Sequence, residues 1–240
     1  MMQSMCKKVI CFDLDDTLYK EIDYLKSAYQ EIISYALSKH NYTSDSYIEL
    51  SLKSYEGMIS TFYEGGNAFQ YLNQLLNLDL PIQEYLNIYR NHKPIISLSK
   101  EVSTILESLK SKGYTLGLIT DGRSIQQRNK IKALGLHQWF EDNNIIISEE
   151  FGSEKPCLRN YKYFMDKYPE VSEYIYIGDN ISKDFITPNK LGWKTICIED
   201  NGLNIHKQIL STSNEYNSIF KANFSNLLSI LDKNYSQISV

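Results

Sequence analysis

The chain has 240 residues, of which 42% are hydrophobic and 22% are charged, and its formal net charge is −4. These are ordinary globular values, and the length allows one large domain or a domain of about 150 residues with a smaller companion. The sequence contains no run of basic residues and no apolar stretch of about 18 residues. We therefore expect neither nucleic acid nor a membrane as a partner.

The N-terminal stretch and the cysteines both favour a cytoplasmic protein. "MMQSMCKKVICFDLDD" has a basic pair, but its apolar part is too short for a signal peptide and runs into acidic residues. The four cysteines show no metal-ligand spacing and fall mostly in apolar contexts: Cys6, Cys11, Cys157 and Cys197. Reduced thiols in a cytoplasm are the simplest interpretation.

The first predicted element is a buried strand over residues 8–14 that ends in acidic residues. In "VICFDLDDTLY", residues 9–19, apolar and β-branched residues run directly into Asp13 and Asp15, with Thr17 after them. Carboxylates this close repel each other, and removing one from water costs several kcal/mol. The pattern makes sense if a positive charge binds there.

A helical segment follows, from about residue 20 to residue 92. Apolar residues recur at helical spacing in four stretches, 22–40, 47–66, 68–78 and 82–92. Four helices of this size form a bundle that buries its own apolar stripes. We therefore predict a helical domain over 19–92, inserted into a core domain made of 1–18 and 93–240. For the residues that flank the two junctions, surface or hinge packing is favoured over a role in the cleft: Tyr19, Lys20, Arg90 and His92.

The remainder of the chain alternates between strands and helices. Strands are predicted at 114–120, 144–148, 174–179 and 194–199, and helices at 99–113, 124–135, 157–168 and 182–192. Residues 218–233 are typical of a short edge strand and a closing helix. The strands are continuously apolar, which is typical of strands covered on both faces. The pattern predicts an α/β fold with a doubly wound parallel sheet.

Polar residues follow four of these strands, where parallel strands bring their ends to one edge of the sheet. Asp13 and Asp15 follow the first strand, Thr120 ends the second, and Asp121 and Gly122 open the next helix. Lys155 follows the third strand, and the fourth leads to Asp179 and Asp184. Carboxylates without histidine or cysteine form a hard oxygen site that suits Mg²⁺.

This set of residues has a chemical meaning in phosphoryl transfer. Asp13 and Asp179 are expected to give carboxylate ligands to Mg²⁺, and Asp15 a backbone carbonyl. A carboxylate beside Mg²⁺ can attack phosphorus, and Asp15 can protonate the leaving alcohol. The phosphoryl oxygens would be held by Lys155, by the Thr120 hydroxyl and by the amides of Asp121 and Gly122. Arg123 is a further candidate for substrate contact, although a solvent-facing position is equally consistent with its place.

The sequence resembles the haloacid dehalogenase-like hydrolase superfamily through "DLDDT", Thr120, Lys155-Pro156 and "GDNISKD". The resemblance implies a Rossmann-like core whose first and fourth strands are neighbours, and a four-helix cap of the first insertion type. It implies that Asp13 is the nucleophile, Asp15 the general acid/base and Asp179 a metal ligand. Thr120 and Lys155 would orient the phosphate, and Asp184 would lie near the metal.

Within that superfamily the residues favour a phosphatase. Dehalogenation does not need the acid/base carboxylate, ion pumps need membrane spans, and the helical segment has no lysine in an evident buried setting for a Schiff base. The sequence predicts a Mg²⁺-dependent phosphomonoester hydrolase that acts on a small phosphorylated metabolite through an aspartyl-phosphate. A sugar-phosphate mutase and a catalytically silent module that binds a phosphorylated ligand remain the alternatives.

Overall fold

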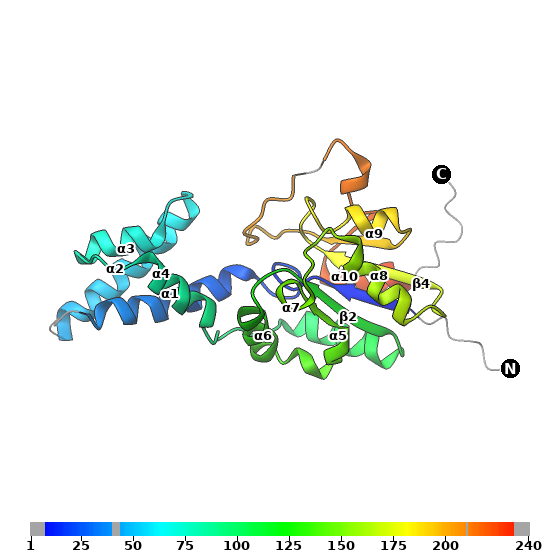
Figure 1. Ribbon diagram of the computed structural model, residues 1–240, viewed down its shortest axis with the longest axis horizontal. Helices are drawn as coiled ribbons and strands as arrows, with labels where there is room; N and C mark the ends of the chain where they lie inside the picture. The colour runs from blue at the N-terminus through cyan, green and yellow to red at the C-terminus, as the bar shows by residue number, and fades with distance from the viewer. Residues whose placement is uncertain (1–7, 40–43, 210, 233–240) are drawn as a thin grey trace.

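The computed structural model describes residues 8–39, 44–209 and 211–232. It shows an α/β core and, beside it, a group of four helices (Figure 1). The predicted fold class is confirmed. Among the described residues, no helix is both long enough and apolar enough to cross a membrane.

The core is built on one parallel sheet of six strands in the order β3-β2-β1-β4-β5-β6. The strands are β1 (Lys8–Phe12), β2 (Thr115–Thr120), β3 (Ile145–Ile147), β4 (Glu173–Gly178), β5 (Lys194–Ile198) and β6 (Phe220–Ala222). All neighbouring strands are parallel. The expected pairing of the first and fourth strands is confirmed, since Phe12 lies opposite Ile177.

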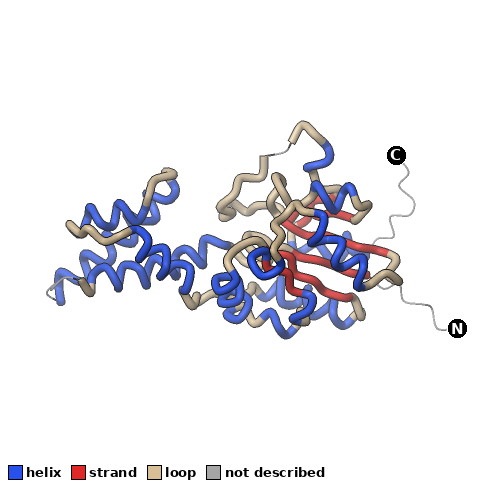
Figure 2. Tube along the Cα trace, in the orientation of Figure 1, coloured by secondary structure: helices blue, strands red, loops and turns tan. Residues whose placement is uncertain are grey.

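Helices cover both faces of this sheet, as Figure 2 shows. Alternate residues of β1 point to opposite faces, so Ile10 and Phe12 belong to one buried cluster and Val9 and Cys11 to another. The first face is covered by α5 (Lys100–Ser111), α6 (Ser124–Ala133) and α10 (Phe224–Asp232). The second is covered by α8 (Leu158–Lys167) and the region of α9 (Ile186–Lys190). Burial on both faces explains why the strands are apolar throughout.

The four helices between β1 and α5 have a hydrophobic interior of their own. They are α1 (Glu21–Leu37), α2 (Ser44–Tyr63), α3 (Ala68–Leu76) and α4 (Ile82–Asn91). Their buried cluster includes Tyr29, Leu72 and Tyr85 and is separate from the two clusters on the sheet. Local signals set the helix ends: the Asn67 side chain accepts the amides of residues 69 and 70 at 3.1 Å, and Asn77 ends α3 in a left-handed conformation.

The predicted helix over 182–192 is much shorter than expected. Only Ile186–Lys190 is helical, as α9, and the residues before it form turns. Pro188 explains the late start, because its ring would clash with the carbonyl group of Asp184 in a longer helix. A short helix after β3, α7 (Ser148–Phe151), was not predicted from the sequence.

The cysteines described by the structure are free thiols. Cys11 and Cys197 are buried and Cys157 is exposed. Cys6 lies outside the described residues.

The separate interior of α1–α4 predicts a local stability effect. Leu72 is fully buried there, so Leu72→Ala should lower the free energy of unfolding by about 2–5 kcal/mol through lost apolar burial and the remaining cavity. Leu52 in α2 is 60% exposed, and Leu52→Ala should change the same quantity by less than about 0.5 kcal/mol. Denaturant unfolding of both variants measures the difference, and equal losses would contradict this assignment of the interior.

Candidate active site

The ends of β1 and β4 bring three acidic side chains together inside the protein. The Asp13 amide donates to the Ile177 carbonyl at 2.8 Å, which continues the β1–β4 pairing by one residue. Asp13, Asp179 and Asp184 are 6%, 3% and 0% exposed, and each offers a carboxylate oxygen within 4.8 Å of the others. The acidic pattern at the two strand ends is therefore one cluster.

Lys155 provides the buried positive charge within this cluster. Its ammonium group contacts the Asp13 carboxylate and lies 2.8 Å from Asp184 Oδ1, and its side chain is fully buried. Burial alone would lower the pKa of Lys155, but the neighbouring carboxylates more than offset this and raise it. The three carboxylates, two of which contact Lys155, carry two more negative charges than this ammonium group offsets if all are ionised. That excess equals the charge of a divalent cation.

The pKa values of Asp13 and Asp179 reflect this excess of negative charge. Burial, together with the charge of Asp184, raises the pKa of Asp13 to about 7 despite Lys155. Burial and the charges of Asp13 and Asp184 raise the pKa of Asp179 to about 9. Carboxylate groups that resist ionisation in this way bind a metal ion favourably, because its charge replaces the proton. The donor set, all oxygen and all buried, fits Mg²⁺.

Asp184 is fixed by the backbone at the end of β4. One carboxylate oxygen accepts the amides of Asp179 and Asn180 at 3.1 and 2.9 Å, while the other faces Lys155. Gly178 makes this possible, since a Cβ there would lie 2.4 Å from the Asp184 carboxylate. With both oxygens engaged, Asp184 is better suited to support the other ligands than to bind a metal ion itself.

Thr120 and Asp15 are joined by a residue that the sequence analysis missed. Gln127 of α6 donates to Thr120 Oγ1 at 2.6 Å and to Asp15 Oδ2 at 2.9 Å. Lys130, one helical turn further on, lies 2.7 Å from Asp15 Oδ1. Burial would raise the pKa of Asp15, but the charge and hydrogen bond of Lys130 outweigh it and lower the pKa. Tyr19, expected to pack at the junction, also donates to Asp15.

The predicted residues after β2 divide between the site and the surface. Asp121 accepts the Lys155 amide at 3.0 Å and pairs with Lys183 at 3.0 Å, so its side chain holds the site together. The Gly122 amide donates to Ser148 Oγ at 3.0 Å, so this amide already has a hydrogen-bond acceptor within the protein. Arg123 forms an exposed ion pair with Glu149 and lies outside the cluster.

The loop after β5 adds to the site a residue that no sequence pattern indicated. Asn204 donates to Asp179 Oδ2 at 2.9 Å, and its own side-chain oxygen accepts from Lys20. The loop is held by Asp16, which accepts the Ile205 amide at 2.8 Å. His92, after α4, lies 2.7 Å from Ser27 Oγ and contacts Glu31, both in α1.

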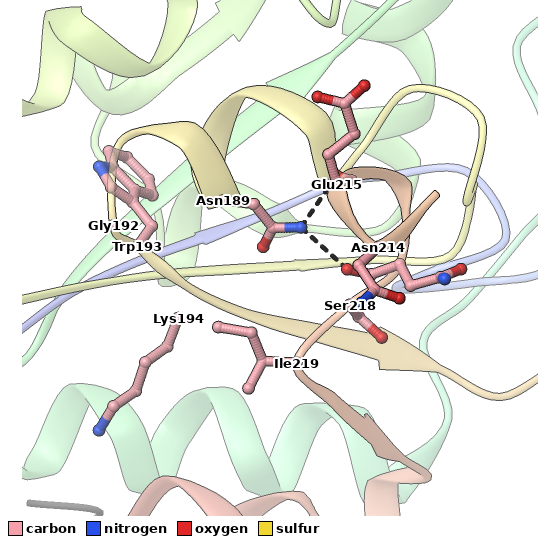
Figure 3. Close-up of a pocket in the computed structure, with 9 residues that line it drawn as sticks. Asn189, Gly192, Trp193, Lys194, Asn214, Glu215, Ser218 and Ile219 are labelled. Atoms are coloured by element: carbon pink, nitrogen blue, oxygen red, sulfur yellow. Dashed lines mark hydrogen bonds between the residues drawn. The ribbon is translucent and has the colours of Figure 1, made fainter. Parts of the chain in front are cut away.

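Several of these residues line one small pocket, whereas Lys155 and Asp184 are buried behind it. It has a volume of about 170 Å³ and is lined by five predicted residues, Asp13, Asp15, Thr120, Asp121 and Asp179. A larger pocket of about 520 Å³ lies at the N-terminal end of β5, whereas the acidic cluster lies at the C-terminal ends of β1 and β4 (Figure 3). There Asn189 donates to the carbonyl groups of Glu215 and Asn217 at 3.0 and 2.8 Å, so its amide stabilises the loop. The acidic cluster belongs to the smaller pocket, which is therefore the candidate active site.

Comparisons with known proteins agree with this geometry. Residues 10–198 match the haloacid dehalogenase-like hydrolase family. A glyceraldehyde 3-phosphate phosphatase of Methanocaldococcus jannaschii is 30% identical over 80% of this chain and 84% of its own length. A phosphoglycolate phosphatase of Aquifex aeolicus is 28% identical over 78% and 83%. The magnesium-bound structure of the putative HAD-hydrolase YfnB from Bacillus subtilis, at 19% identity, covers 95% of this chain and 99% of that one with a TM-score of 0.64.

The family match extends from β1 to β5 and thus includes the strands that carry the acidic cluster. The chain belongs to the haloacid dehalogenase-like hydrolase family.

Proposed function

We propose that this hydrolase is a phosphatase that cleaves the phosphoric monoester of a small metabolite through an aspartyl-phosphate on Asp13. The observation that carries the proposal is the placement of Asp13, which shares a buried cluster with Asp179 and Asp184 and contacts Lys155. The curated phosphatase relatives support the reaction class.

In the first step a carboxylate oxygen of Asp13 bonds to phosphorus and the ester bond breaks. The leaving alcohol takes its proton from Asp15. Lys155 and the Thr120 hydroxyl bind phosphoryl oxygens, and the positive charge of Lys155 offsets the negative charge on them. In the second step Asp15 removes a proton from water, which attacks phosphorus, releases phosphate and restores Asp13.

Asp13 and Asp179 are the proposed Mg²⁺ ligands, together with the backbone carbonyl of Asp15. When bound, Mg²⁺ supplies positive charge at the phosphoryl group and the nucleophile. Asn204 and the Thr17 hydroxyl, which is 3.4 Å from Asp179 Oδ1, keep Asp179 in place, and Asp184 stabilises the strand end.

The substrate is proposed to be a short phosphorylated metabolite. The pocket of about 170 Å³ is smaller than the roughly 300–1,000 Å³ of typical ligand sites. The relatives are named for glyceraldehyde 3-phosphate and phosphoglycolate. Both compounds are phosphate esters with only a few carbon atoms, and they are the first substrates to test.

Replacing the nucleophile tests the covalent mechanism. Asp13→Asn should lower phosphate release from phosphoglycolate, glyceraldehyde 3-phosphate and p-nitrophenyl phosphate about 1,000-fold or more with Mg²⁺ present, because an amide cannot form the phosphoryl bond. Asp142→Asn is the control, since that side chain is 77% exposed and away from the cluster. Equal rates in wild type and Asp13→Asn would exclude the mechanism. Ligand binding without turnover in the wild type would identify a binding module.

The raised pKa values predict a pH-dependent affinity for Mg²⁺. Asp13 and Asp179 have pKa values of about 7 and about 9, so at pH 6 both hold protons that Mg²⁺ must displace. The affinity should therefore increase from pH 6 to pH 8, by about tenfold per pH unit for each proton released. Isothermal titration calorimetry measures it, and Asp179→Asn should weaken binding and reduce the pH dependence. The same affinity at pH 6 and pH 8 would contradict the assignment.

A further inference from the structure

Lys130 is a buried cation that the reaction described above does not use. Its side chain is 1% exposed, and its ammonium group lies 2.7 Å from Asp15 Oδ1 and 3.4 Å from Glu21 Oε1. The Tyr24 ring lies beneath it, with the ring centre 4.7 Å from the ammonium nitrogen. Burying an ammonium group costs several kcal/mol unless it is paired, and a buried ion pair often stabilises a fold no better than apolar residues. The placement of Lys130 therefore calls for more than a contribution to stability.

Three parts of the molecule meet at this ammonium group. Asp15 follows β1, Lys130 lies in the core helix α6, and Glu21 is the first residue of α1, the first of the four helices beside the core. A second contact joins α6 to the other end of the four-helix group. Asn129 of α6 donates to the carbonyl group of His92, the residue after α4, at 3.0 Å. α6 therefore touches both junctions between the core and the four helices.

The contacts around Asp15 fix the direction of its carboxylate. Lys130 and the Tyr19 hydroxyl donate to Oδ1, and Gln127 donates to Oδ2 at 2.9 Å. Gln127 and Lys130 are three residues apart and project from the same face of α6. Of the three donors to Asp15, only Lys130 is charged. Hydrogen bonds between charged groups are stronger than those from neutral donors, so the Lys130 contact is expected to be the strongest of the three.

We propose that Lys130 is a positioning residue that orients the Asp15 carboxylate for proton transfer, and that Glu21 anchors Lys130 to the first of the four helices. This inference rests on the proposed acid/base function of Asp15. The orientation of Asp15 then depends on where α1 begins, which links the proton donor to the four helices beside the core. Proton transfer needs the donor within hydrogen-bond reach of the leaving oxygen, so a misdirected Asp15 loses catalysis rather than binding.

The test uses two leaving groups that differ in their need for a proton. The ratio kcat/KM reports on the steps up to release of the alcohol, and p-nitrophenolate leaves without protonation whereas an alkoxide does not. Lys130→Met should lower kcat/KM about tenfold or more for phosphoglycolate and less than about threefold for p-nitrophenyl phosphate. Lys132→Met, an exposed position on the same helix, is the matched control and should leave both values unchanged.

A second variant guards against a folding defect in Lys130→Met. Glu21→Gln affects a side chain that is 22% exposed and removes the charge that pairs with Lys130; because Glu21 also lines the pocket, its effect is judged by the preference between the two substrates. Glu21→Gln should also lower kcat/KM more for phosphoglycolate than for p-nitrophenyl phosphate, but the loss for phosphoglycolate should be smaller, about threefold. Equal losses on the two substrates, or no loss on phosphoglycolate, in either folded variant would overturn the proposal.

A measurement without turnover separates this proposal from the proposed function. In a crystal structure of Lys130→Met the Asp15 carboxylate should turn away from its wild-type direction. An unchanged Asp15 would overturn the positioning role whether or not the protein hydrolyses phosphate esters. If the wild type hydrolyses neither substrate, the proposed function fails, and the direction of Asp15 still decides the role of Lys130.

Discussion

The balance of charge at the ends of β1 and β4 is the constraint on which the rest of the site depends. Asp13, Asp179 and Asp184 are almost completely removed from water, and Lys155 compensates only one of them. Such a cluster is costly in a protein interior unless a cation completes it. The parallel pairing of β1 with β4 keeps the acids together, because it fixes the backbone on both sides of the cluster. The fold therefore holds a site whose residues are separated by more than 160 positions in the chain.

The sequence indicated the core fold and the acidic cluster because both follow from local patterns. Continuous apolar runs such as β1 are required where a strand is covered on both faces, and polar residues after such runs must gather at one edge of a parallel sheet. Asp13, Lys155 and Asp179 could be assigned on that basis. The division into a core and an inserted domain at residues 19–92 stays a prediction, although the helices in this range share a separate hydrophobic interior.

Other features depend on tertiary contacts that no local pattern reveals. Lys130 lies in a helix so polar that a charged residue is expected to face water, yet it is buried against Asp15 and Glu21. The three-residue spacing of Gln127 and Lys130 places them on one helix face, but it does not distinguish a buried face from an exposed one. Asn204 reaches Asp179 in a loop that Asp16 holds by its backbone, through a contact between residues 189 positions apart. The short length of α9, in contrast, could have been predicted from the sequence, because Pro188 excludes a helix that begins at residue 182.

The separation of the hydrophobic interiors has an evolutionary consequence. The apolar cluster of α1–α4 is distinct from the two clusters that support the sheet and its acidic edge. Substitutions confined to this cluster change the interior of the helical group, although Tyr24 and Ala28 of α1 belong to one of the sheet clusters. Selection can therefore alter much of this helical interior at little cost to the sheet that carries the acidic cluster. An ancestral sheet with one reaction could in this way give rise to many descendants that differ mainly in the compounds they accept.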